Sequence, residues 1–469
     1  MAKKIIIVGG GITGLTTAYY LLEKLAHVEG DFDIQVLEAS NRVGGKIHTV
    51  HRDGFVLERG ADSFLERKTA AVELVEQLGI SDHLVRNSTG QAYVLLGDTL
   101  HQIPAGSFMG IPVQEDALVG TGLISEEGKK RVQEELDVPK GEAVEDQSLG
   151  EFLRRRFGDE LIENLVEPLL SGIYSSDIDE MSIMASFPQF YKLEQEYGSV
   201  VKGLRATLPS NRASTGKKKG QFLSFEDGLQ TLVDALVRGI GEDRIRTQSR
   251  VTEITQGENG YTLKVNGEKI EADAVIMTIP HAKVLGVFAS TNVFQPFTQM
   301  PMSSVANVVC AFDASAISES LEGTGFVVSR NSNHRMTACT WTHRKWPTTT
   351  PVGKALLRAY VGKPSDQEVM ELTDEEIKGI VLRELKETMG IQEQPLFTMV
   401  SRWKEMMPQY RVGHVEAVRE VRDQLTAVLP GVFITGSSYE GVGIPDCIAQ
   451  GKQTVEEVVK FLKKNVKNT

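Results

Sequence analysis

The chain has 469 residues, enough for two or three domains if each takes about 150 residues. Apolar residues make up 41% and charged residues 24%, as in ordinary globular proteins, and a net charge of −12 argues against a nucleic-acid-binding protein. The three cysteines have no metal-like spacing and the nine histidines form no recognisable cluster, so we expect no disulfide framework, no metal site and a reducing, cytoplasmic setting.

The N-terminal segment predicts the start of a nucleotide-binding unit. Four apolar residues, Ile5–Val8, predict a short buried strand, and Gly9, Gly11 and Gly14 follow it as G-x-G-x-x-G. The first glycine permits a tight turn, the second lets backbone approach a pyrophosphate, and the third lets the next helix pack on the strand. Free N–H groups where that helix begins, near Ile12, suit phosphate oxygens.

The residues that follow strengthen this interpretation over that of a glycine-rich hairpin. A second strand at 34–37 ends in Glu38, at the place where an acidic residue meets a ribose hydroxyl. Gly44 and Gly45 predict a turn with close backbone approach. Arg42 offers a bidentate phosphate contact or is an ordinary surface arginine. The unit suits NAD and FAD equally.

A hairpin and a helix are predicted next. Residues 47–59 alternate apolar and polar side chains around Asp53 and Gly54, a hairpin pattern. The turn at 60–64 leads into a helix that reaches Leu78, and a chain leaving the nucleotide unit here would pass the reactive end of the cofactor.

The middle of the chain divides into a helical and a strand-rich part. Residues 80–219 predict a mostly helical insertion, with short strands at 92–96 and 99–103, helices at 125–136 and 148–170, and a mobile loop at 209–220. A helix at 229–238 and small strands at 250–254 and 261–265 come next. The buried run 272–280 would extend the first sheet, so the nucleotide domain is predicted to be discontinuous. A second, sheet-based domain is predicted from strands at 304–312, 325–329, 336–341 and 355–361 and a helix at 374–389.

The C-terminal stretch repeats the pattern of strand, glycine loop and helix. After a predicted helix at 412–429, a strand at 431–436 leads to a glycine-rich loop, and Pro445 and Asp446 mark the start of a helix that ends near Lys464. The start of that helix can face negative charge that develops on a cofactor ring, although an ordinary strand–helix connection is the alternative. No stretch approaches the roughly 18 apolar residues of a membrane-spanning helix.

These segments together resemble the flavin amine oxidase superfamily, on the N-terminal GGGITG, the ADAVIMTIP strand and the terminal ITGSSYEGVGIPDCIAQG. Within it, the chain resembles the protoporphyrinogen oxidase family in the segments GADSFLERK, LVEPLLSGIYSSDIDEMS, EGTGFVVSR and TACTWTHRKWP. In that family it most resembles the coproporphyrinogen III oxidases of Gram-positive haem synthesis. The resemblance implies an α/β protein with a glutathione-reductase-like FAD-binding Rossmann domain (1–79, 220–290 and 411–469), a helical insertion (80–219) and a substrate-binding domain (291–410).

The resemblance also implies which residues contact FAD. They are Gly9, Gly10, Gly11, Ile12, Thr13 and Gly14 at the pyrophosphate, Glu38 and Ala39 at the ribose, Arg42 and Lys46 near the diphosphate, Gly60, Ala61, Asp62 and Ser63 beside the ring, Val251 at the adenine end, Trp403 near the ring, and Gly436, Val442, Gly443 and Ile444 at the ribityl and pyrimidine end.

The implied reaction is the six-electron oxidation of a porphyrinogen by successive hydride transfers to flavin, with oxygen as the final acceptor and hydrogen peroxide as by-product. It needs no metal or nucleophile, and we name no catalytic acid or base. The propionates of a coproporphyrinogen need cations, for which we expect Lys68 first, then Arg67, with Arg330 and Lys345 as further candidates.

Several alternatives stay open. An amine oxidase or a carotenoid desaturase would share both end motifs, and a flavin-binding sensor without turnover would share the first. An amine oxidase would need an aromatic pair at the flavin face, for which only Trp403 and Tyr439 are available. Also open are weak membrane association, the choice between coproporphyrinogen and protoporphyrinogen, and transient contact with a chelatase.

Overall fold

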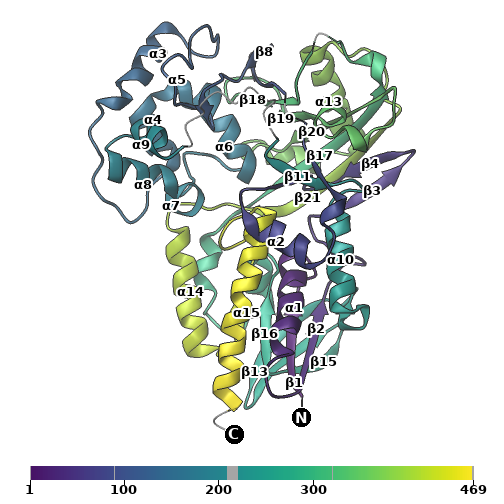
Figure 1. The fold of residues 1–469 in the computed structure, drawn as a ribbon. Coiled ribbons are helices and arrows are strands. Elements are labelled where there is room, and N and C mark those ends of the chain that lie inside the picture. The colour runs from purple at the N-terminus through teal and green to yellow at the C-terminus, as the bar shows by residue number, and fades with distance from the viewer. Residues whose placement is uncertain (1, 89, 209–219, 320, 467–469) are drawn as a thin grey trace.

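The computed structural model describes residues 2–88, 90–208, 220–319 and 321–466. One half of the molecule is built on a five-stranded parallel sheet with the strand order β12-β2-β1-β16-β22 (Figure 1). These strands are β1 (Lys3–Val8), β2 (Phe32–Leu37), β12 (Ile245–Arg246), β16 (Ala274–Met277) and β22 (Val432–Ile434). Strand β16 pairs with β1, so the buried run at 272–280 does extend the first sheet.

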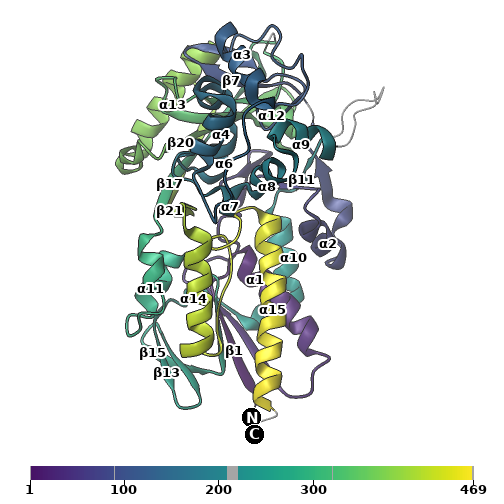
Figure 2. The same ribbon diagram turned by 90° about the vertical axis from the view of Figure 1, so that its left-hand side faces the viewer.

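Alternation along β1 explains how the two faces of this sheet are covered. Ile5 and Ile7 pack against helices on one face, whereas Ile6 and Val8 belong to the core on the other face. The helices of the first face are α1 (Ile12–Leu25), α2 (Thr69–Gln77), α10 (Gln230–Ile240) and α15 (Ile444–Val466). Figure 1 shows α1 between α15 and α10, and Figure 2 shows the same helices from the side of α15. The second face is covered by β13 (Val251–Gly257), β14 (Gly260–Val265), β15 (Glu268–Ala272), α11 (His281–Val287) and α14 (His414–Val428).

The other half contains a seven-stranded sheet with the order β21-β17-β20-β19-β18-β7-β8. Its strands are β7 (Ala92–Leu96), β8 (Thr99–Gln102), β17 (Met302–Asp313), β18 (Gly325–Val328), β19 (Met336–Trp341), β20 (Lys354–Val361) and β21 (Phe397–Pro408). Helix α13 (Asp374–Met389) packs on one face, and a capping box of Thr373 and Glu376 starts it.

Two strands of this sheet come from the segment predicted as a helical insertion. The predicted strands at 92–96 and 99–103 form β7 and β8, and β7 pairs with β18 in parallel. Residues 92–102 therefore extend the seven-stranded sheet. Only hydrogen bonds between segments far apart in the chain could assign these short strands to a sheet. The three-domain division, with its boundary at residue 80, stays a prediction.

Helices α3 to α9 form the region beside this sheet (Figure 1). They are α3 (Glu126–Gln133), α4 (Leu149–Phe157), α5 (Asp159–Leu161), α6 (Glu167–Tyr174), α7 (Ile183–Ser186), α8 (Pro188–Tyr197) and α9 (Val200–Thr207). The helix predicted at 148–170 is interrupted, because Gly158 adopts a φ of +83° between α4 and α5. A π-helical turn at 162–166 then leads into α6.

The remaining short elements lie outside the two large sheets. They are β3 (Thr49–Arg52), β4 (Phe55–Glu58), β5 (Phe64–Leu65), β6 (Leu84–Arg86), β9 (Ser107–Phe108), β10 (Ile111–Pro112), β11 (Phe222–Phe225) and α12 (Thr342–Lys345). The predicted hairpin around Asp53 and Gly54 is formed by β3 and β4. The loop predicted at 209–220 lies, except for Gly220, outside the described residues.

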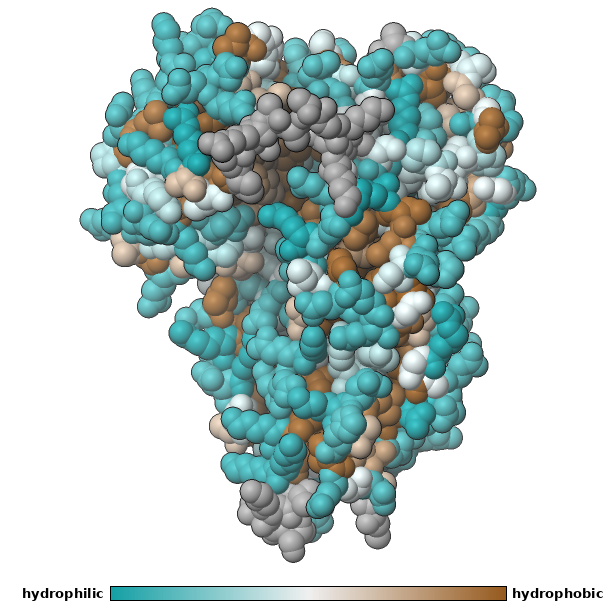
Figure 3. All heavy atoms as spheres, in the orientation of Figure 1, coloured by the Kyte–Doolittle hydropathy of each residue, from teal (hydrophilic) through white to brown (hydrophobic). Residues whose placement is uncertain are grey.

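The surface and the helix lengths bear on the question of membranes. Figure 3 shows that hydrophilic residues cover most of one face, with hydrophobic residues in smaller groups. Of the helices described, none is both long and apolar enough to cross a bilayer.

Candidate active site

A cavity of about 1180 Å³ begins at the carboxyl ends of the parallel strands and reaches the seven-stranded sheet and helix α6. Open α/β sheets bind ligands at this edge, outside the carboxyl ends of their strands. The volume exceeds that of a pocket for one drug-sized molecule, which is about 300–1,000 Å³. The cavity therefore has room for a long cofactor together with a second ligand.

The glycine turn shapes the cofactor end of this cavity. A Cβ on Gly14 would lie 1.9 Å from the backbone oxygen of Gly9, so this glycine lets α1 pack on β1. A Cβ on Gly11 would meet no atom within 4 Å, and Gly11 lines the cavity. Helix α1 begins at Ile12 without a side-chain cap, so its first N–H groups remain available to an anion. These features fit a pyrophosphate bound against the Gly11 backbone, in space that a side chain at position 11 would occupy.

Glu38 and Arg42 form hydrogen bonds with backbone groups of the glycine turn and of the loop that follows β2. The Glu38 carboxylate accepts hydrogen bonds from the N–H groups of Gly10 at 2.8 Å and Ser40 at 2.7 Å, and it lines the cavity. A carboxylate with four lone-pair sites keeps capacity for a ribose hydroxyl. Arg42 does not line the cavity, because its guanidinium donates to the carbonyls of Val43, Ile47 and Gly45. It supports the glycine turn, and a phosphate contact stays a prediction.

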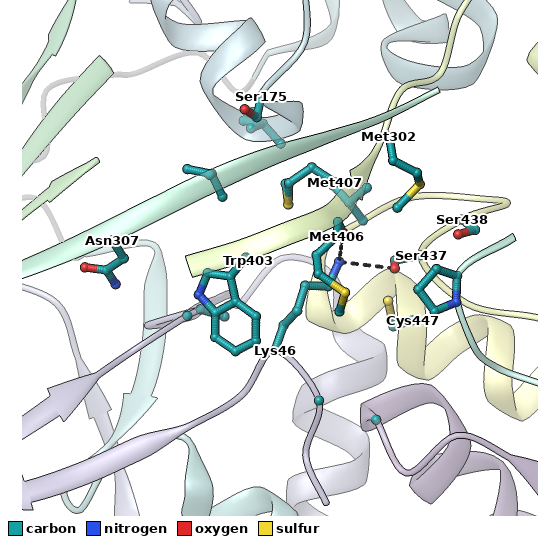
Figure 4. Close-up of a pocket in the computed structure, with 18 of the residues that line it drawn as sticks. Lys46, Ser175, Met302, Asn307, Trp403, Met406, Met407, Ser437, Ser438 and Cys447 are labelled. Carbon is teal, nitrogen blue, oxygen red and sulfur yellow. Dashed lines mark hydrogen bonds between the residues drawn. The ribbon is translucent and has the colours of Figure 1, made fainter. Parts of the chain in front are cut away.

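Lys46 places a partly buried ammonium group in the cavity wall. Its Nζ donates to the Met406 carbonyl at 3.0 Å and to Ser437 Oγ at 3.3 Å, as Figure 4 shows. Burial lowers the pKa of Lys46, and the neighbouring Cys447 thiol acts in the opposite direction. The cation therefore sits where its charge would be strongly felt by an anionic ligand.

The loop from Gly60 to Ser63 lines the cavity and is held from the second half of the molecule. The carboxylate of Asp62 lies 3.1 Å from Arg358 and 3.4 Å from Lys345, while Arg358 also donates to the Gly60 carbonyl at 2.6 Å. Burial would raise the pKa of Asp62, but Lys345 and Arg358 hold it well below its usual range. Asp62 is therefore a permanent carboxylate whose role is to fix the loop.

One face of strand β17 forms the opposite wall. Side chains alternate along this strand: Val305 and Asn307 line the cavity, whereas Ala306 and Val308 belong to the core under α13. Asn307 is 1% exposed, donates from Nδ2 to the Glu58 carbonyl, and its Oδ1 has no hydrogen-bond partner within the described chain. This acceptor fits a ligand N–H group, since a buried polar atom without a partner is costly.

Trp403 stands beside this wall, on the strand paired with β17. Its Nε1 donates to the Arg59 carbonyl at 2.8 Å, and its ring lies between Asn307 and Lys46 in Figure 4. Tyr439, the other aromatic residue considered for the flavin face, is buried and does not line the cavity.

Most residues expected to contact the cofactor line this one cavity. Those that do are Gly9, Gly11, Ile12, Thr13, Glu38, Ala39, Lys46, Gly60, Ala61, Asp62, Ser63, Val251, Trp403, Val442 and Ile444. Those that do not are Gly10, Gly14, Arg42, Gly436 and Gly443. Gly436 supports its neighbours, with a φ of +120° and a virtual Cβ 3.3 Å from Thr13. Direct contact of any of them with a cofactor stays a prediction.

The basic residues expected to bind the substrate differ in whether they line the cavity and in their ion-pair partners. Neither Arg67 nor Lys68 lines the cavity, and Lys68 Nζ is 2.6 Å from an Asp446 oxygen. Arg330 lines the cavity but pairs with Glu167, Asp177 and Asp179.

Sequence reasoning missed the residues of the second wall, notably Asn307, Tyr360 and Lys363. For Asn307 a signal existed, because it is a polar residue inside the run 305–312, which is otherwise apolar. Lys363 gave none, since a lysine after a strand is usually a solvated surface residue.

Comparisons with known proteins agree with this geometry. The model of the flavin-containing amine oxidoreductase family matches residues 12–459. The chain is 47% identical over 463 residues to a coproporphyrinogen III oxidase of Bacillus subtilis, covering 98% of both chains, and 42% identical to one of Staphylococcus aureus, covering 98% of this chain and 100% of that protein.

Solved structures share the fold of this chain. A crystal structure from Exiguobacterium sp. 255-15, assigned as a protoporphyrinogen oxidase, superposes with a TM-score of 0.88 at 38% identity and covers 99% of both chains. A putrescine oxidase superposes with a TM-score of 0.69 at 18% identity, covering 98% of this chain and 99% of that one, which shows a shared fold alone.

Proposed function

Because the chain belongs to the flavin-containing amine oxidoreductase family and, within it, to the coproporphyrinogen III oxidases, we propose that it oxidises coproporphyrinogen III to coproporphyrin III in haem biosynthesis. It is a flavin-dependent oxidoreductase. We further propose that the flavin is FAD, since the glycine turn, the Glu38 carboxylate and the N-terminus of α1 suit a dinucleotide.

A bound flavin would supply a two-electron acceptor that oxygen reoxidises with release of hydrogen peroxide, so three rounds complete the six-electron oxidation. The protein has to orient the porphyrinogen, exclude water and hold charge in place. Gly60 to Ser63 on one side and Asn307 with Trp403 on the other bound the space between the two halves. Asn307 Oδ1, which has no hydrogen-bond partner in the described part of the chain, suits a pyrrole N–H donor or a flavin N–H group.

The observation that carries the proposal is the single cavity that continues from the glycine turn to the seven-stranded sheet. A cofactor-only site would not need the wall formed by Asn307, Tyr360 and Lys363. The amine oxidase alternative lacks support at the flavin face, because Trp403 lines the cavity and Tyr439 does not.

Oxygen uptake and porphyrin fluorescence test the proposal. The flavin-loaded protein is given coproporphyrinogen III, protoporphyrinogen IX or simple amines under air, with an uncatalysed control for each substrate. We expect oxygen uptake and porphyrin fluorescence with coproporphyrinogen III, weaker turnover with protoporphyrinogen IX and none with amines. Porphyrin formation at the uncatalysed rate with both porphyrinogens would overturn the proposal.

A further inference from the structure

The substrate end of the cavity contains one half-buried lysine whose charge is not neutralised by a partner. Lys363 lines the cavity just after β20, next to Gly362, whose carbonyl accepts a hydrogen bond from Ser175 Oγ at 3.3 Å. Among the residues that the structure describes, none forms an ion pair or a hydrogen bond with the Lys363 ammonium group.

The backbone of Lys363 is nevertheless firmly held. Its carbonyl accepts hydrogen bonds from Asp366 N at 2.9 Å and from Gln367 Nε2 at 3.0 Å. Gln367 is itself bonded to both backbone groups of Ser304, and Asp366 forms a bidentate pair with Arg335. The ammonium group is thus presented from a fixed loop, which lowers the entropy cost of binding an anion.

The other cations of this end are already neutralised. Arg330 faces three carboxylates, those of Glu167, Asp177 and Asp179, and Lys345 pairs with Asp62. Burial lowers the pKa of Lys363, while Glu384, Asp366 and Glu167 raise it from beyond ion-pair distance. A partly buried cation without a close partner is stabilised when an anion binds beside it and forms an ion pair.

We propose that Lys363 binds a propionate carboxylate of the porphyrinogen and is a substrate-binding residue of this enzyme. This inference rests on the proposed function, and it moves the carboxylate-binding role from Arg67 and Lys68 to the loop after β20. The ligand class is a macrocycle carrying carboxylates, and the contact is a charge-assisted hydrogen bond from Nζ.

Binding of the product coproporphyrin III to the flavin-loaded protein tests this, by flavin and porphyrin fluorescence. Lys363→Met should weaken binding about ten- to a hundred-fold, the usual range for a hydrogen bond to a charged group, while Lys363→Arg should retain most of the affinity. Lys354→Met is the matched control, because Lys354 lies at the other end of β20 and pairs with Asp313 outside the cavity. Coproporphyrin tetraamide should bind wild type and Lys363→Met alike.

Equal affinity of wild type and Lys363→Met for coproporphyrin III, within about twofold, would overturn the inference. Lys363→Gln is measured in parallel, so that a failure of the methionine variant to load flavin does not decide the result. Failure of the proposed function looks different, because wild type would then neither bind coproporphyrin III nor oxidise its porphyrinogen.

Discussion

Replacing Gly11 by alanine should separate cofactor binding from folding. The Gly11 backbone has φ −74° and ψ 177°, which alanine adopts without strain, and its Cβ would meet no atom of the protein within 4 Å. We expect the free energy of unfolding of the flavin-free protein to change by less than about 0.5 kcal/mol. The added methyl group would project from the cavity wall where a pyrophosphate approaches the backbone. Overpacking of this kind costs about 1–3 kcal/mol, so flavin should bind about five- to a hundred-fold more weakly.

Gly14→Ala is the matched comparison, because it adds the same methyl group three positions along the motif. Its Cβ would lie 1.9 Å from the Gly9 carbonyl oxygen and 2.8 Å from Thr278 Oγ1, so α1 must move away from β1. We expect a loss of about 3 kcal/mol or more in the stability of the flavin-free protein.

The assay is a titration of both flavin-free variants with FAD, followed by flavin fluorescence, together with urea unfolding. Gly11→Ala protein that binds FAD as tightly as wild type would refute the assignment of the pyrophosphate to this turn. Gly11→Ala protein that unfolds as easily as the Gly14→Ala variant would refute the packing argument.

Three further predictions concern the charges around the cavity and the core. Arg358→Leu leaves the Gly60 carbonyl without its donor and Asp62 with one cation, so urea unfolding should show a loss of about 3–5 kcal/mol; a loss below about 1 kcal/mol would contradict the buried pair. Lys46→Met removes the partly buried ammonium group, so FAD should bind about ten-fold more weakly in a fluorescence titration, and unchanged affinity would place the diphosphate elsewhere. Burial lowers the pKa of His414 to about 4, so the unfolded state binds the extra proton below pH 6.5 and stability is lost as the pH falls toward 4. Between pH 7 and 5 this amounts to about 2 kcal/mol, and His414→Phe should reduce the pH dependence of the free energy of unfolding, measured with urea, by that amount; an unchanged dependence would contradict a neutral buried histidine.

Local patterns predicted a large share of the fold. The apolar run Ile5–Val8, the helix that begins after Thr373 and the hairpin at Asp53 each depend on neighbours within a few residues. Backbone dihedral requirements and side-chain periodicity act at that range, so the sequence alone contains them. The interruption at Gly158 was missed because apolar periodicity continues across it and does not reveal its φ of +83°.

The candidate site was predictable wherever the ligand is expected to meet backbone. The glycine turn and the loop at 60–63 are continuous stretches, and the structure brings both to one cavity. Long side chains were less predictable. Arg42 has carbonyls within its own loop as partners, while Lys68 has Asp446, from the opposite end of the chain.

By itself, the sequence determined that a dinucleotide-type turn begins the chain and that a second glycine loop precedes the last helix. Tertiary structure decided which charges are available to a ligand. Arg330 and Lys345 are neutralised by carboxylates distant in sequence, whereas the loop after β20 leaves Lys363 without a close partner among the described residues. Coulomb interactions depend on distance in space and on burial, and neither quantity can be obtained from residue spacing along the chain.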